Sequence, residues 1–192
     1  HRLELALREG LIVAASADGQ VTALDAASGD VEWQVSLDVP ISGGPGSGKE
    51  GIALGTAEGE ILLLSESDGS VRWRSQVSSE VLAPPAVGQD TVVARTGDGR
   101  VFALEASDGS QRWLYSRSVP SLSLRGHSAP VLVRNGVVSG FDNGRLSALG
   151  LADGEPAWEA TVAVPEGRTD LERMIDIDAD PIVARGDLFA GA

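Results

Sequence analysis

A fifteen-residue unit that occurs four times constrains the fold of this chain more than any other feature. Each copy reads Gly-x-apolar-x-Ala/Leu-Leu, then three variable residues, Ser/Asp-Gly, three more variable residues and Trp. The copies span residues 19–33, 59–73, 99–113 and 144–158, and each ends on one of the four tryptophans of the chain. The first three tryptophans are 40 residues apart, and the last interval is 45. Self-similarity at a period of this length indicates a repeat architecture.

One repeat predicts four short antiparallel strands. In the third copy, the apolar residues 101–104 begin with the alternation of a strand, and Asp108-Gly109 then favours a tight hairpin turn before the strand that ends at Trp113. A further apolar run, 91–94, comes before the unit and is joined to it through Asp98-Gly99. With one more apolar segment upstream, each period supplies one blade of a β-propeller. We therefore predict an all-β propeller of four-stranded antiparallel blades.

The recurrent tryptophan is interpreted as a packing residue rather than a ligand-binding one. A single blade cannot bury both of its faces, so neighbouring blades must stack. An indole ring at the same place in every copy would fill the space between two adjacent blades.

Composition excludes several classes of function. The net charge is −13 and the isoelectric point is about 4.4, which disfavours binding to nucleic acid or to an anionic membrane surface. No apolar stretch is long enough to span a bilayer. The chain begins without a signal peptide, so we expect a cytosolic protein or a mature or truncated piece of a longer one. The absence of cysteine fits any compartment.

The stretch Gly43–Lys49, GGPGSGK, nearly matches a phosphate-binding loop. The next residue is Glu50, so the hydroxyl that would hold Mg²⁺ is missing. A strand, residues 52–54, is predicted where the motif requires a helix N-terminus. We interpret the stretch as a flexible turn within the second blade.

Two insertions interrupt the regular spacing at the same point of successive blades, between the outer strand of one blade and the inner strand of the next. Insertions on one side of a repeat protein typically mark its binding surface. The first insertion, residues 119–127, carries Leu122, Leu124 and Arg125, which together suggest a small protein-binding patch. The alternative is that the two leucines fold back onto the core.

The second insertion, residues 166–180, is acidic. It contains Asp176, Asp178 and Asp180, whose alternation suggests calcium. A calcium loop of the EF-hand type starting at Asp176 would place Pro181 where glycine is required, so we expect no metal. Acidic groups held for a basic partner are the preferred interpretation, and a solvated loop is the alternative.

The inserted segments carry a family resemblance. The repeat, A-L-D-A-x-[ST]-G-x-x-x-W in its first copy, resembles that of quinoprotein dehydrogenases and their non-enzymatic relatives. The segments 120–126, 128–130 and 142–148, together with 169–178 and Pro181, are similar to the BamB family over essentially the whole chain. Members are propeller lipoproteins of the machinery that assembles outer-membrane β-barrels.

The resemblance implies a non-enzymatic scaffold with eight blades and PQQ-like repeats, held by a lipid at the periplasmic face of the outer membrane. It implies binding to the periplasmic POTRA domains of BamA, assistance to unfolded outer-membrane proteins, and no cofactor. The BamA-binding positions of the family match Leu122, Leu124, Arg125, Asp176 and Asp178.

Two departures shape our expectation of the domain. The lipidated cysteine is absent, so membrane attachment is expected only through an anchor outside this chain, and about half of the blades are missing. We expect residues 1–192 to form one partial propeller domain, a fragment, with blades ending near Trp33, Trp73, Trp113 and Trp158 and a fifth blade beginning at about residues 179–192.

The competing function is that of a quinoprotein dehydrogenase fragment. Such an enzyme needs calcium, pyrroloquinoline quinone and a catalytic aspartate in the central channel. The chain has no vicinal cysteine pair of the kind that many such enzymes carry beside the cofactor. No cysteine nucleophile is available, and His127 has no evident triad partner in the sequence. We therefore expect no catalytic residues.

Overall fold

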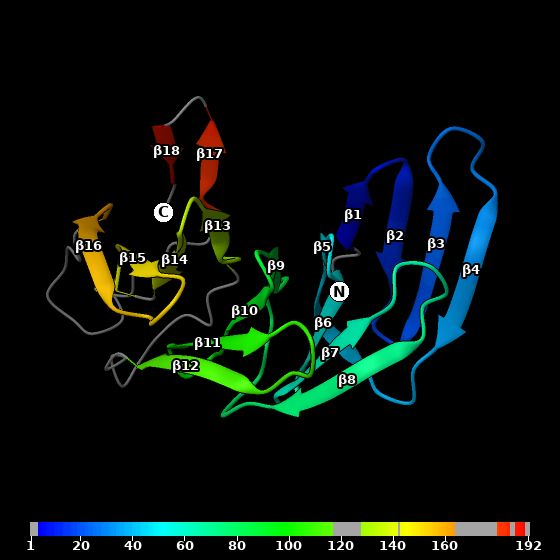
Figure 1. Ribbon diagram of the computed structural model, residues 1–192, viewed down its shortest axis with the longest axis horizontal. Coiled ribbons are helices and arrows are strands. Elements are labelled where there is room, and N and C mark those ends of the chain that lie inside the picture. The colour runs from blue at the N-terminus through cyan, green and yellow to red at the C-terminus, as the bar shows by residue number, and fades with distance from the viewer. Residues whose placement is uncertain (1–3, 117–127, 142, 164–179, 185–186, 191–192) are drawn as a thin grey trace, which may run out of the picture.

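The computed structural model describes residues 4–116, 128–141, 143–163, 180–184 and 187–190 (Figure 1). Within these ranges the regular structure is entirely β, with four four-stranded sheets and one two-stranded sheet. In each sheet every strand pairs antiparallel with the next strand of the sequence. The prediction of an all-β fold built from four-stranded antiparallel blades is confirmed.

The blades follow the repeats in order, each from its inner to its outer strand. Blade 1 contains β1 (Glu4–Arg8), β2 (Leu11–Ala15), β3 (Gln20–Asp25) and β4 (Val31–Ser36). Blade 2 contains β5 (Ile41–Gly48), β6 (Gly51–Thr56), β7 (Glu60–Leu64) and β8 (Val71–Gln76). Blade 3 contains β9 (Ala86–Gly88), β10 (Thr91–Arg95), β11 (Arg100–Glu105) and β12 (Gln111–Ser116). Blade 4 contains β13 (Val131–Val133), β14 (Gly136–Phe141), β15 (Arg145–Gly150) and β16 (Pro156–Thr161). The hairpin β17 (Ile182–Ala184) and β18 (Asp187–Phe189) follows.

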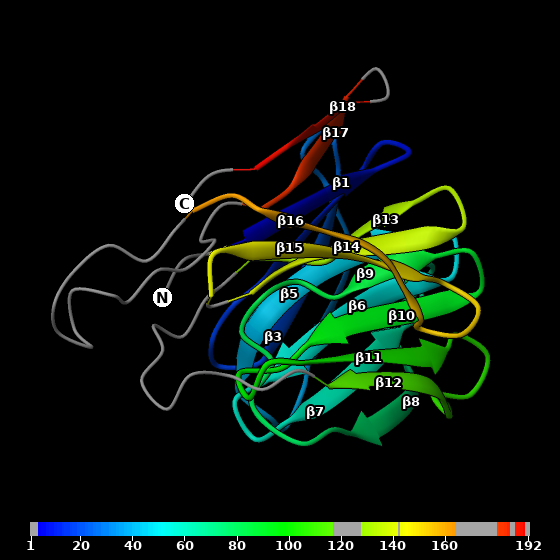
Figure 2. The same cartoon turned by 90° about the vertical axis from the view of Figure 1, so that its left-hand side faces the viewer.

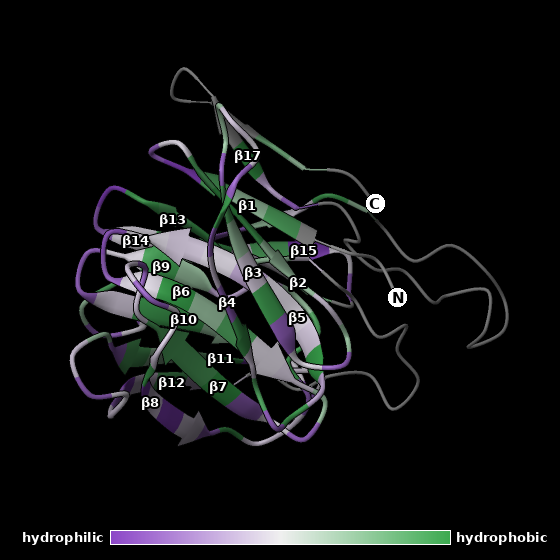
Figure 3. Ribbon diagram, turned by 90° about the vertical axis from the view of Figure 1, so that its right-hand side faces the viewer, coloured by the Kyte–Doolittle hydropathy of each residue, from purple (hydrophilic) through white to green (hydrophobic). Residues whose placement is uncertain are grey.

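The blades succeed one another along an arc, with their inner strands toward its centre (Figure 1). Inner strands of neighbouring blades contact one another from β1 to β17. Seen from the side, the strands run across the molecule and their turns gather at its two edges (Figure 2). The middle strands β6, β10 and β11 are largely hydrophobic, whereas the turns are hydrophilic (Figure 3).

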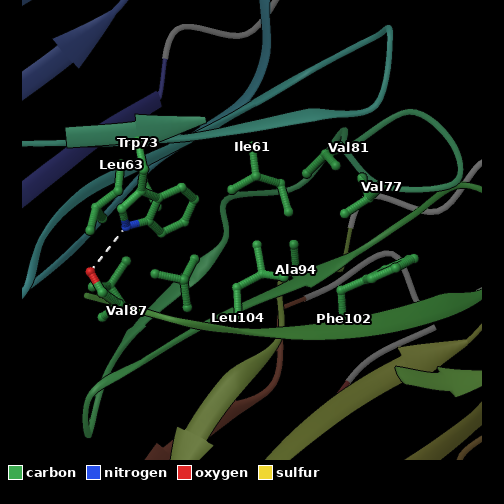
Figure 4. Packing of buried hydrophobic residues seen from close by; sticks show 12 residues of the cluster. Ile61, Leu63, Trp73, Val77, Val81, Val87, Ala94, Phe102 and Leu104 are labelled. Carbon is green, nitrogen blue, oxygen red and sulfur yellow. Dashed lines mark hydrogen bonds between the residues drawn. The ribbon is translucent and has the colours of Figure 1, made fainter. Parts of the chain in front are cut away.

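Strand β7 shows why blades must stack. Its residues Ile61 to Leu64 form an unbroken apolar run, and none of the four is exposed to solvent. Ile61 and Leu63 belong to the cluster shared with blade 3, shown in Figure 4, whereas Leu62 and Leu64 belong to the cluster shared with blade 1. Both faces of this strand are therefore buried, which explains the loss of the polar–apolar alternation expected of a half-exposed strand.

The repeat tryptophan joins each blade to the next, as predicted, in the first three blades. The indole Nε1–H of Trp73 donates to the carbonyl of Ala106 at 3.0 Å, as Figure 4 shows. The corresponding bonds of Trp33 and Trp113 reach Glu66 at 2.9 Å and Leu151 at 2.8 Å. Trp158 differs, because 45% of its surface is exposed.

The interpretation of Gly43–Lys49 as a turn is wrong. All but its last residue lies in β5, and the turn is formed by Lys49 and Glu50. The glycines have a packing role: an added Cβ at Gly46 would lie 1.7 Å from the carbonyl oxygen of Pro85, and one at Gly48 would lie 2.3 Å from that of Val87. The backbone of the next inner strand thus passes too close for any side chain here.

Candidate protein-binding side

The connectors between blades leave on one side of the molecule, which we call the connector side. It also carries the turns between the second and third strands of each blade. The backbone N–H of Leu37 donates to Gly19 at 2.8 Å, that of Val77 to Gly59 at 2.7 Å and that of Val162 to Gly144 at 2.9 Å. Each of these described connectors therefore begins against the turn of its own blade. Both predicted insertions belong to connectors of this kind.

The five predicted partner-binding residues, Leu122, Leu124, Arg125, Asp176 and Asp178, lie outside the described residues. Their flanks are described. The first insertion follows β12, which ends at Ser116, and precedes Ser128. The chain before the second insertion is described up to Ala163, and Asp180, the last residue of that insertion, is described.

A hydrogen bond joins the last residue of the second insertion to the chain just after the first insertion. The backbone N–H of Ala129 donates to Oδ1 of Asp180 at 2.6 Å. Ala129 leads into β13 of blade 4, and Asp180 leads into β17. Two segments 51 residues apart in sequence are thus in direct contact on the connector side. The alternation of Asp176, Asp178 and Asp180 predicts one acidic group, and the structure shows in addition that Asp180 accepts a backbone hydrogen bond from blade 4.

Arg95 is a second residue that sequence analysis missed. It ends β10 on the connector side, is only 4% exposed, and its guanidinium lies 5.9 Å from the ring centre of Phe141 in blade 4. The strand register shows what is unusual about it. Arg95 pairs with Val101, and the corresponding positions of the other three blades hold Ala15, Gly55 and Gly140. Three of the four blades have alanine or glycine at this position, whereas blade 3 has arginine. Aligning the four repeats of the sequence would have revealed this difference.

On the opposite side of the molecule, described residues line clefts between neighbouring blades. The cleft between blades 1 and 2, of about 400 Å³, is lined by four carboxylates, from Glu9, Asp25, Glu32 and Glu66. The equivalent cleft between blades 2 and 3, of about 420 Å³, is lined by both signs of charge, including Lys49, Arg72 and Glu105. Because the lining changes between equivalent positions, the clefts follow from blade packing and do not repeat one ligand site.

An ion pair of blade 3, between Arg112 and Glu105, lies at the second cleft, which Glu105 lines. Arg112 donates from Nε to Oε1 of Glu105 at 2.7 Å and from Nη2 to Oε2 at 2.6 Å. These hydrogen bonds lower the pKa of Glu105 below its ordinary value and raise that of Arg112. Nη1 of Arg112 also donates to the hydroxyl of Thr91, so the pair ties together three strands of one blade. Its role is structural.

Among the described residues, no three or more His, Asp or Glu side chains are placed so that together they could hold a metal ion. Within the same residues, no helix is long and apolar enough to cross a membrane.

Comparison with known proteins identifies the family. A family model described as outer membrane protein assembly factor BamB matches residues 17–192. The chain belongs to the BamB family.

Several BamB proteins are similar over the whole chain. The outer membrane protein assembly factor BamB of Alkalilimnicola ehrlichii is 57% identical over 192 residues, which are 100% of this chain and 50% of that protein. BamB of Pseudomonas aeruginosa is 54% identical over 97% of this chain and 49% of its own length. The crystal structure of BamB from Moraxella catarrhalis superposes with a TM-score of 0.90 at 30% identity, covering 97% of this chain and 57% of that one. The chain thus spans about half the length of the BamB proteins it matches.

The BamB relatives confirm the family resemblance inferred from the two insertions. Their name describes an assembly factor and not an enzyme, which agrees with the expectation of a non-enzymatic protein. No observation favours the quinoprotein dehydrogenase alternative.

Proposed function

We propose that this chain is part of a scaffold subunit of the outer-membrane β-barrel assembly machinery. It acts at the periplasmic face of the outer membrane, where the whole protein is held by a lipid, and binds the POTRA domains of BamA. Its partner-binding residues are Leu122, Leu124 and Arg125 in the first insertion and Asp176 and Asp178 in the second. The relatives named outer membrane protein assembly factor support the general role.

The observation that carries the binding proposal is the hydrogen bond between Ala129 and Asp180, 2.6 Å long. It joins Asp180, the last residue of the second insertion, to Ala129, just after the first insertion, and this supports the proposal that one partner contacts both insertions. The chemistry is complementary: two leucines supply apolar contact, Arg125 pairs with a carboxylate of the partner, and Asp176 and Asp178 accept from its basic groups. Charged groups of both signs would fix the orientation of the partner.

The buried tryptophans support a scaffold rather than a ligand site. Trp73 and Trp113 are 8% and 7% exposed and bond to the next blade. The rings are therefore committed to packing and are not free to hold a planar cofactor.

Calorimetry with an isolated BamA POTRA array tests the proposal. We expect the parent chain to bind and Arg125→Glu to lose binding. Lys49→Glu makes the same change of charge on the opposite side, at a side chain that is 64% exposed, and should bind like the parent. Equal affinity of Arg125→Glu and the parent, or no binding by a parent shown to be folded, would overturn the proposal.

A further inference from the structure

We propose that Asn135 is a site of spontaneous deamidation, at which blade 4 acquires a carboxylate and an isoaspartate link. The chain has only two asparagines, Asn135 and Asn143, and glycine follows each of them. A glycine in this place favours attack of its backbone nitrogen on the asparagine side chain, because it has no Cβ to obstruct the approach. Both pairs lie in hairpin turns of blade 4, so the two turns must be compared.

The reaction needs only water. The backbone nitrogen of Gly136 loses its proton and bonds to Cγ of Asn135, the Cγ–Nδ2 bond breaks, and ammonia leaves. Water then opens the five-membered imide. Cleavage between nitrogen and Cγ gives aspartate, whereas cleavage between nitrogen and the former backbone carbonyl carbon gives isoaspartate, with one more carbon atom in the main chain. Nothing is oxidised or reduced, and either product adds a negative charge.

The turn that contains Asn135 leaves its side chain accessible. Asn135 lies between β13 and β14, its side chain is exposed, and no described residue forms a hydrogen bond with its side-chain amide. Its φ is +58°, which asparagine tolerates better than most residues other than glycine, so the turn itself explains why asparagine is present. Gly136, which carries the attacking nitrogen, pairs with Val133 at the end of the three-residue strand β13. Opening the end of so short a strand costs little free energy.

The turn that contains Asn143 is held more firmly. Oδ1 of Asn143 accepts the backbone N–H of Arg145 at 3.2 Å, and the side chain is half-buried. The nitrogen that would attack, that of Gly144, donates to Phe141 at 3.1 Å, and the carbonyl of Gly144 accepts from Val162 at 2.9 Å. Attack requires the side chain and the glycine nitrogen to leave these partners, so Asn143 should react more slowly.

Conversion of Asn135 would affect the contact between blades 3 and 4. The carbonyl of Asn135 accepts the backbone N–H of Leu151 at 3.1 Å. The carbonyl of Leu151 in turn accepts the indole N–H of Trp113 at 2.8 Å. In isoaspartate the former Asn135 carbonyl becomes a carboxylate outside a main chain that is longer by one atom. The isoaspartate product therefore weakens the position of Leu151, on which Trp113 depends, whereas the aspartate product keeps the original main chain.

Two variants with a single asparagine each test the assignment. Asn143→Asp leaves only Asn135 and introduces the residue that blades 1 and 3 have at this turn, Asp18 and Asp98. Asn135→Gly leaves only Asn143 and keeps a residue that tolerates positive φ. Both variants are incubated at mildly alkaline pH, in native buffer and in urea, and mass spectrometry follows the exchange of an amide for a carboxylate. The Asp-Gly turns of the chain can isomerise through the same imide, but their mass does not change.

We expect Asn143→Asp to gain mass about tenfold faster than Asn135→Gly in native buffer, because the Asn143 turn must first break more hydrogen bonds. In urea, where both turns are unfolded, the two variants should react at similar rates. Equal rates in native buffer, or a faster reaction of Asn135→Gly, would overturn the inference. So would an Asn143→Asp sample that stays unconverted in native buffer while its urea sample reacts.

The second readout is the contact between blades. The isoaspartate and aspartate products of Asn143→Asp are separated by chromatography and compared with the unreacted chain. We expect amide hydrogen exchange at Leu151 to be faster in the isoaspartate product and unchanged in the aspartate product. Asn135→Gly, incubated in the same way, is the control for general ageing. Equal protection of Leu151 in all three forms would overturn the predicted effect on the Trp113 contact.

Discussion

The ring of Trp73 lies against Gly109 so closely that a Cβ added to this glycine would be 2.6 Å from the ring atom Cε3. A Cβ added to Gly69 would lie equally close to Cε3 of Trp33, and one added to Gly154 equally close to Cε3 of Trp113. The tryptophan that ends one repeat and the glycine in the turn of the next are therefore one contact unit. The tryptophan and the glycine are both recurrent positions of the sequence repeat, but the repeat alone does not show that they touch across two blades.

Gly109→Ala should destabilise the chain far more than Gly29→Ala. Both glycines have positive φ, +75° and +78°, so both variants carry the backbone cost of about 1–2 kcal/mol. Only Gly109 has a tryptophan over it, since a Cβ at Gly29 meets nothing within 4 Å. We expect an additional loss of about 1–3 kcal/mol from overpacking, measured by urea denaturation. Equal losses would show that the ring moves aside without cost.

Trp73→Ala should lower the free energy of unfolding by about 3–5 kcal/mol, because it opens a cavity between blades 2 and 3. Trp158→Ala is the matched control at the equivalent repeat position, where 45% of the side chain is exposed, and should cost much less. Thermal and urea unfolding of the two variants measure the difference. A comparable loss in both would contradict the assignment of the buried rings to interblade packing.

Gly46→Ala should prevent blades 2 and 3 from packing in their present arrangement. Its Cβ would lie 1.7 Å from a backbone oxygen of Pro85, and a backbone atom cannot rotate away. We expect a loss above about 3 kcal/mol or failure to fold, seen in the near-ultraviolet circular dichroism of the tryptophans. Gly88→Ala is the control, because the nearest atom there is the flexible end of Leu132 at 3.1 Å.

Glu105→Gln should be less stable than the parent at neutral pH, by up to about 1 kcal/mol for a partly exposed ion pair. The pKa of Glu105 is lowered by its hydrogen bonds to Arg112. Its stabilisation is therefore complete above the pKa of the unfolded chain and is lost as the pH falls through the lower folded value. Urea denaturation of both proteins along a pH series should show the difference shrinking toward acid. A difference independent of pH would exclude the ion pair as its cause, and Glu155→Gln, at an exposed turn, provides the baseline.

Much of the fold could be predicted because short apolar runs and the Asp-Gly turns between them indicated the same strands. Asp98-Gly99 and Asp108-Gly109 indicated hairpins, and both glycines have the positive φ that such turns require. Stretch 43–49 could not be predicted in the same way. Its glycines look like a turn when only their neighbours in sequence are considered. Gly43, Gly46 and Gly48 are required because the backbone of residues 81–87, more than 35 residues away in sequence, passes close to them.

Only part of the candidate site could be predicted from the sequence, because some of its contacts join residues that are distant in sequence. The two insertions could be located from spacing, and the connector side follows from strand order. The hydrogen bond of Asp180 depends on a backbone N–H in another blade. The pattern D-x-D-x-D alone does not show that its third aspartate makes this bond. Arg95 could have been found by comparing aligned repeats position by position rather than by searching for motifs.

The tryptophan–glycine contact links each blade only to its successor, so the chain resembles a row of coupled units more than a single centred core. Local unfolding at one contact between blades does not require the other contacts between blades to break. Amide hydrogen exchange should therefore be slowest in β6, β7 and β10, where both faces are covered, and should quicken toward blade 1 and toward the hairpin β17–β18. Such a gradient would let a partner bound at the insertions protect blade 4 while leaving blade 1 free to open.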